Sequence, residues 1–167
     1  MVKVIIPIGK APNNNIIIFL AGPIQGAENW QDKAIDILRN EITDCVIANP
    51  RREYIDDEFE YNKQVEWETE YLNKAAKNGV IMFWLAKEMT HFCNRAYAQT
   101  TRFELAEWKT KYHYNKKINL VIGIEDGFTN ERYIRKRMKE DCPDIHIEAS
   151  LKDTCRQVIK IVKELKM

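Results

Sequence analysis

The stretch that decides the fold is Ile16-Ile17-Ile18-Phe19-Leu20-Ala21, which ends at Gly22-Pro23. Consecutive apolar residues rich in β-branched side chains are typical of a strand that is buried on both faces. Working outward from it, further apolar runs predict strands at residues 45–48, 80–85, 118–124 and, more weakly, 145–149.

Helical periodicity fills the intervals between these strands. Residues 29–42, 59–76, 100–112 and 130–140 are predicted as helices. A last helix opens at Ser150, which is a good N-cap residue. Strands that alternate with helices indicate parallel βαβ units. We therefore predict an α/β fold with a doubly wound, mainly parallel five-stranded sheet, helices on both faces, and residues 2–8 as a candidate extra N-terminal edge strand.

The composition is that of one ordinary domain, and we expect residues 1–167 to form it. Hydrophobic residues make up 45% of the chain, enough for a core, and the net charge of +1 argues against a nucleic-acid binder, which would carry a basic excess. No apolar stretch approaches the roughly 20 residues of a membrane span. The start of the chain lacks the pattern of a signal peptide. We expect a soluble, cytoplasmic protein with no membrane contact.

The cysteines do not suggest a metal site. All four are widely spaced and form no cluster with the three histidines: Cys45, Cys93, Cys142 and Cys155. Zinc ligands are grouped at short spacings, so we expect no bound metal and reduced thiols.

Two glutamates stand on the apolar stripes of predicted helices. Glu68 lies three residues after Val65 and four before Leu72, and Glu104 lies three after Thr101 and four before Trp108. An inward-facing carboxylate costs several kcal/mol unless partners hold it, so both residues are candidate catalytic groups.

Each glutamate also has a structural interpretation. We place Glu104 in the first turn of its helix, where the macrodipole favours the charged form that a nucleophile requires, but where glutamate is also a common stabiliser. Glu68 could instead pair with Arg51 or Arg52.

Candidate binding residues follow the predicted strands, since ligands of doubly wound sheets lie beyond the carboxyl ends of the strands. Gly22, Pro23 and Gln25 follow the first strand, either as a close-approach loop or as a plain turn. Asn49 and Arg51 follow the second, either as ligand contacts or as a proline-stopped strand end. Trp30 is one of four tryptophans that either stack on a flat base or belong to the core.

Five blocks carry a resemblance to a known family. They stand in this order: Phe19-Leu20-Ala21-Gly22-Pro23-Ile24, Asn49-Pro50-Arg51-Arg52, Gln64-Val65-Glu66-Trp67-Glu68, Ile81-Met82-Phe83-Trp84 and Arg102-Phe103-Glu104-Leu105-Ala106-Glu107-Trp108. Over residues 16–124 the chain resembles the nucleoside 2-deoxyribosyltransferase-like family.

The resemblance implies a flavodoxin-like sheet and an enzyme that moves 2-deoxyribose between nucleobases without a metal or organic cofactor. It makes Glu104 the nucleophile, gives Glu68 an assisting role, and places Gly22 and Pro23 beside the substrate. It also implies a homo-oligomer whose neighbouring subunit completes each site, with Asn130 or Asp126 as the contributed residue.

The physical interpretation and the resemblance together predict a double displacement through a deoxyribosyl–glutamate ester, with a deoxynucleoside and a free nucleobase as substrates. One alternative is a nucleoside or nucleotide N-glycosidase on the same fold, in which water is the acceptor. Pro23, Ile24 and Gln25 stand where a 5′-phosphate site would want hydroxyl and glycine donors, which favours uncharged nucleosides. The other alternative is a non-catalytic nucleotide-binding module.

Overall fold

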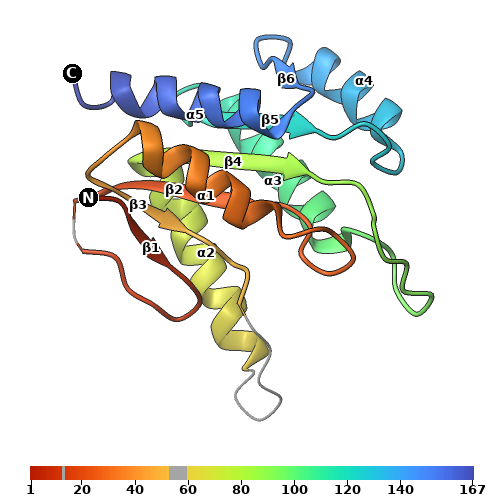
Figure 1. Cartoon of the computed structure of the whole chain (residues 1–167). Coiled ribbons are helices and arrows are strands. Elements are labelled where there is room, and N and C mark those ends of the chain that lie inside the picture. The colour runs from red at the N-terminus through yellow and green to blue at the C-terminus, as the bar shows by residue number, and fades with distance from the viewer. Residues whose placement is uncertain (13, 53–59) are drawn as a thin grey trace.

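The computed structural model describes residues 1–12, 14–52 and 60–167. Its described strands form one parallel sheet in the order β1-β3-β2-β4-β5-β6 (Figure 1). Their bounds are β1 Lys3–Ile5, β2 Ile16–Ala21, β3 Cys45–Ala48, β4 Gly79–Leu85, β5 Leu120–Ile124 and β6 Ile147–Glu148.

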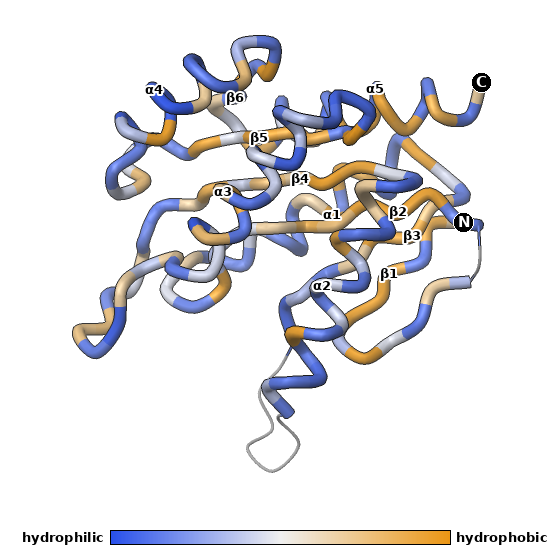
Figure 2. The backbone as a smooth tube through the Cα atoms, turned by 180° about the vertical axis from the view of Figure 1, so that it is seen from behind, coloured by the Kyte–Doolittle hydropathy of each residue, from blue (hydrophilic) through white to orange (hydrophobic). Residues whose placement is uncertain are grey.

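Helices follow five of these strands and cover both faces of the sheet. Their bounds are α1 Trp30–Glu41, α2 Tyr61–Lys77, α3 Gln99–Tyr114, α4 Glu131–Asp141 and α5 Leu151–Glu164. Helices α1 and α5 bury their apolar sides on one face, and α2, α3 and α4 bury theirs on the other. Figure 2 shows the strands as a hydrophobic layer between helices whose outer turns are hydrophilic.

The alternation of side chains along each strand explains the two cores. In β2, for example, Phe19 packs on the α2 and α3 side while Ile18 and Leu20 pack on the α1 and α5 side, and all three are buried. A strand buried on both faces has no polar positions, which is why the run 16–21 is continuously apolar.

The topology fixes where a ligand site can form. From β2 the chain crosses by α1 to β3 on one side, and then by α2 to β4 on the other side of β2. The loops after β2 and β4 therefore leave in opposite directions, and a crevice opens at the carboxyl ends of these two strands.

The predicted α/β fold is confirmed, including the parallel sheet and the extra N-terminal strand, which is β1. The strand predicted at residues 145–149 is reduced to the two half-buried residues of β6, and the one predicted from residue 118 begins at Leu120. The start of the helix predicted from residue 59 lies outside the described residues. No helix in the described ranges is both long and apolar enough to cross a membrane.

Candidate active site

A pocket of about 350 Å³ lies past the carboxyl ends of β2 and β4. The turn after β2, the first half of α2, the loop after β4 and the first turns of α3 form its walls. Of the residues predicted from the sequence, five line it: Gly22, Pro23, Gln25, Glu68 and Glu104. The pocket therefore brings both candidate carboxylates to the crevice at the carboxyl ends of β2 and β4.

Gly22 is held against two tryptophans. A Cβ atom at this position would lie 2.3 Å from the carbonyl oxygen of Trp84 and 2.6 Å from Cζ2 of Trp30, so only glycine fits. Trp30 is fully buried, and its Nε1 donates a hydrogen bond of 2.9 Å to the carbonyl oxygen of Pro23. Trp30 thus supports the turn from beneath, and the structure does not bring it to the pocket wall.

Arg51 holds the same turn through hydrogen bonds to its backbone carbonyl oxygens. Its Nη2 donates to the carbonyl oxygens of Ile24 and Glu28, each at 3.1 Å, and its Nε donates to Oε1 of Gln31 at 2.9 Å. The buried Asn49 accepts a 3.0 Å hydrogen bond from the Arg51 backbone N–H.

Arg51 and Asn49 do not line the pocket, whereas their neighbours Pro50 and Arg52 do. The sequence places this block correctly at the strand end, but it does not show which of two adjacent arginines turns inward.

Glu68 and Glu104 stand on facing helices, α2 and α3, and both are partly buried. Nε2 of Gln64, one turn earlier on α2, donates a 2.8 Å hydrogen bond to Oε1 of Glu68. Within the described ranges, no hydrogen bond reaches the carboxyl group of Glu104. Its environment is set by burial and by nearby charge.

The pKa of Glu104 is raised to about 8, mainly because burial disfavours the charged form and further because Glu68 and Glu107 are also negative when ionised. Burial likewise raises the pKa of Glu68, an effect that the hydrogen bond from Gln64 opposes. One proton shared between two such carboxyls is the arrangement in which one acts as a base or nucleophile and the other as an acid.

The expectation that Glu104 lies in the first turn of its helix is wrong. Helix α3 begins at Gln99, and its first turn contains no acidic residue. The macrodipole acts over only about one turn, so burial outweighs it at Glu104.

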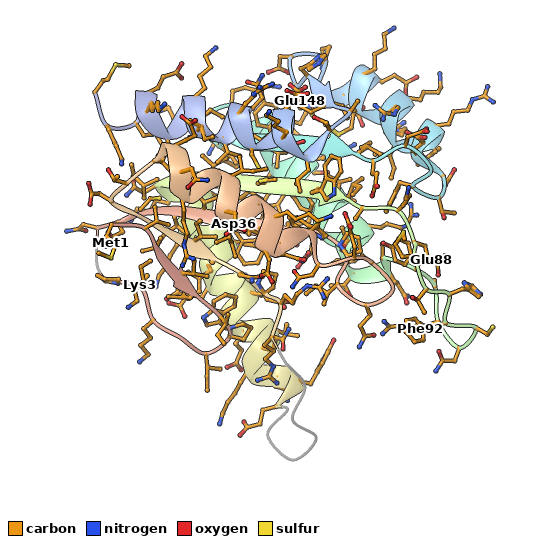
Figure 3. All side chains as sticks on the ribbon, in the orientation of Figure 1. Met1, Lys3, Asp36, Glu88, Phe92 and Glu148 are labelled. Atoms are coloured by element: carbon orange, nitrogen blue, oxygen red, sulfur yellow. The ribbon has the colours of Figure 1, made fainter. Side chains whose placement is uncertain are left out.

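Six pocket residues come from the loop after β4, for which the sequence predicted a ligand-binding edge but no site residue: Glu88, Phe92, Arg95, Ala96, Tyr97 and Ala98. Figure 3 labels Glu88 and Phe92 on this loop, which extends away from the sheet. Tyr97 is anchored by a 2.7 Å hydrogen bond from its hydroxyl to the carbonyl oxygen of Ala86. The length of the loop, at the predicted ligand-binding edge, was the signal that could have found it.

A second hollow of about 560 Å³ runs between α2 and α3. It shares six residues with the main pocket, both carboxylates among them: Tyr61, Val65, Glu68, Gln99, Thr100 and Glu104. The two carboxylates therefore border both spaces.

Asn130 lies away from both hollows. It is exposed, in a left-handed conformation with φ of 63°, and precedes α4. Among the described residues, no group of three or more histidine, cysteine, aspartate or glutamate side chains is arranged to hold a metal ion.

The parallel sheet with helices on both faces places the protein in the doubly wound α/β class, with two carboxylates in the pocket at the carboxyl ends of β2 and β4. The chain belongs to the family described as nucleoside 2-deoxyribosyltransferase like, whose model matches residues 15–128. The matched segment spans β2 to β5 and contains Glu68 and Glu104, and it confirms the resemblance drawn from the five blocks. No curated protein matches the chain.

Proposed function

We propose that this protein is a nucleoside 2-deoxyribosyltransferase that exchanges the base of 2-deoxynucleosides through a covalent deoxyribosyl ester of Glu104. The observation that carries the proposal is the pair of carboxyl groups, Glu104 and Glu68, on facing walls of one pocket. The family membership supports the nucleoside as the substrate class.

In the first step an ionised oxygen of Glu104 attacks C1′ on the side opposite the base. The bond between C1′ and the base nitrogen breaks, its electron pair stays on the base, and the base takes a proton from Glu68 or from a water that Glu68 orients. Burial raises the pKa of Glu68, which favours its acid form. Glu68, when ionised, raises the pKa of Glu104 in turn, so the pair suits one charged and one neutral carboxyl.

In the second step a different base attacks C1′ from the side that the first one left. Its nitrogen gives a proton back to Glu68, the ester bond breaks, and Glu104 returns to its carboxylate form. Two inversions give net retention at C1′, as in retaining glycosidases. The turn held by Trp30 and Arg51 would seat the substrate against this pair.

Base exchange tests the proposal directly. The protein is incubated with a 2-deoxynucleoside and a different free base, and the products are separated by chromatography. We expect a new nucleoside, and we expect Glu104→Ala and Glu104→Gln to abolish it while the circular dichroism spectrum stays unchanged. Glu70→Gln is the matched control, because Glu70 lies on the exposed side of α2 in an ion pair with Lys74. Wild-type activity in either Glu104 variant would remove the nucleophile assignment.

Hydrolysis is a second candidate function. The hollow between α2 and α3 borders the same carboxylates, so water held in it would lie beside them. Free deoxyribose in the same assay, with no new nucleoside, would identify a hydrolase. Neither product would identify a non-catalytic binding module.

We further propose a homo-oligomer in which Asn130 or Asp126 of one subunit reaches the pocket of another. Both side chains are exposed, and they precede α4. Sedimentation gives the oligomer size, and a mixture of Glu104→Ala and Asn130→Ala proteins that regains activity would support shared sites.

A further inference from the structure

Gln64 holds an unused hydrogen-bonding atom on the pocket wall. It lies in the first turn of α2, half-buried, and lines the main pocket together with Glu68. Its Nε2 donates to Oε1 of Glu68 at 2.8 Å. Its Oε1 is buried and has no hydrogen-bond partner among the described residues.

The hydrogen bond to Glu68 determines which polar atom of the Gln64 amide remains without a partner among the described residues. An ionised carboxylate only accepts hydrogen bonds, so in the state in which Glu68 is ionised the Gln64 nitrogen faces Glu68 and the oxygen faces away, which is the orientation that the structure shows. The leftover atom is therefore an acceptor, and it can be satisfied only by an N–H or O–H group.

A buried acceptor without a donor is unfavourable, and it is rare unless a ligand or water completes it. Gln31 offers a comparison, because its Nε2 is also buried without a partner. Gln31 is fully buried behind the turn and does not line the pocket, so a ligand does not reach it. Gln64 lies where a ligand would lie.

We propose that Gln64 is a specificity-determining residue whose Oε1 accepts a hydrogen bond from the substrate. The inference rests on the proposed function for its substrate class. The donor is a hydroxyl of the sugar or an exocyclic amine of the base, because a nucleoside carries both kinds of group. In either case Gln64 ties substrate recognition to Glu68, the residue one turn further along α2.

The test compares substrates that differ in one donor. A 2-deoxynucleoside is compared with its 2,3-dideoxy analogue, which lacks the 3′-hydroxyl, and 2-deoxyadenosine is compared with purine 2-deoxyriboside, which lacks the amine. Binding is measured by calorimetry and base exchange by chromatography, each for wild type, Gln64→Met and the control Lys63→Met. Lys63 is exposed and pairs with Glu60 on the same turn.

We expect wild type to prefer the donor-bearing member of one pair by roughly 10- to 100-fold, the range for a hydrogen bond to a buried acceptor. Gln64→Met, similar in length but without an acceptor, should reduce that preference to about threefold or less. Lys63→Met, which leaves the Gln64 amide in place, should keep the preference. The pair that loses its discrimination identifies the donor.

The outcomes separate this inference from the proposed function. Base exchange with undiminished discrimination in Gln64→Met overturns the role of Gln64 and leaves the transferase. Binding without exchange, with discrimination lost in Gln64→Met, keeps the role of Gln64 and removes the transferase. If no nucleoside binds, both proposals fall.

Discussion

In the proposed reaction, the carboxyl group of Glu104 has to lose its proton before it attacks the sugar, whereas its surroundings favour the protonated form. Burial and the neighbouring carboxylates raise its pKa to about 8. In the free protein at neutral pH Glu104 is therefore mostly neutral, and pH controls how much of the proposed nucleophile is ionised.

We expect the rate of base exchange to rise between about pH 6.5 and 8, because the ionised fraction of Glu104 increases over that range. Initial rates at a low, fixed nucleoside concentration across pH 5.5–9.5, on the order of ten points, measure it. A rate that stays flat or falls through this range would contradict a nucleophile with a raised pKa.

The raised pKa of Glu104 also predicts how the stability of the fold depends on pH. The folded-state pKa of Glu104 lies above its ordinary value of 4.5, so the folded protein binds more protons than the unfolded chain between pH 4.5 and about 8. Stability therefore falls as pH rises through that window, and the loss is complete above it.

Glu104→Gln removes the titrating group. We expect it to match wild type at pH 5 and to exceed it by about 1–3 kcal/mol at pH 9, since one pKa unit corresponds to about 1.4 kcal/mol and water in the open pocket reduces the effect. Urea unfolding at both pH values measures the difference. A variant less stable than wild type at pH 9 would show that Glu104 is held in its charged form.

At the scale of elements, the turn between β2 and α1 depends on close packing. Gly22→Ala would place a methyl group against the backbone oxygen of Trp84 and the ring of Trp30. We expect a loss of about 2–4 kcal/mol in the free energy of unfolding, because backbone must move to make room.

Gly127→Ala is the matched control for this turn. Gly127 also has a positive φ, of 88°, but the nearest atom to its added Cβ is Cδ of Lys87 at 3.9 Å. Its cost should be limited to backbone strain, about 1 kcal/mol. Equal losses in the two variants, by thermal or urea unfolding, would show that crowding at Gly22 contributes nothing.

The elements also show what local patterns can and cannot predict. The β-branched runs predicted every strand that builds the site, because burial on both faces leaves an unambiguous pattern. The start of α3 is less visible in the sequence. Its N-cap, Ala98, is left-handed with φ of 55° and offers no side-chain hydrogen bond, so no capping residue marks the boundary. The predicted start at residue 100 differs from the observed start by one residue, and Glu104 lies beyond the first turn counted from either position.

At the scale of the whole molecule, the described strands hydrogen-bond into one sheet with a core on each face. We propose that residues 1–167 unfold as one cooperative unit. Calorimetry should give a single transition whose calorimetric and van't Hoff enthalpies agree. Two separate transitions would divide the chain into two domains.

The site was predictable only in part, because its members meet through contacts that no local pattern encodes. The two carboxylates could be found, since an acidic residue on an apolar stripe is conspicuous. The supporting roles of Trp30 and Arg51 could not, because each depends on where the turn after β2 lies in space. Gln64 has no such signal, since glutamine in a first helical turn is ordinary until its neighbours are known.

Arg51 and Trp30 support the floor of the pocket without lining it, Gly22 lines it, and the loop with Glu88 and Phe92 extends outward from the sheet. In the proposed reaction, the helices that carry the two carboxylates form one part of the site and this outer loop forms another. Exchanging the loop for others is therefore a way to alter the range of bases accepted without disturbing Glu68 or Glu104.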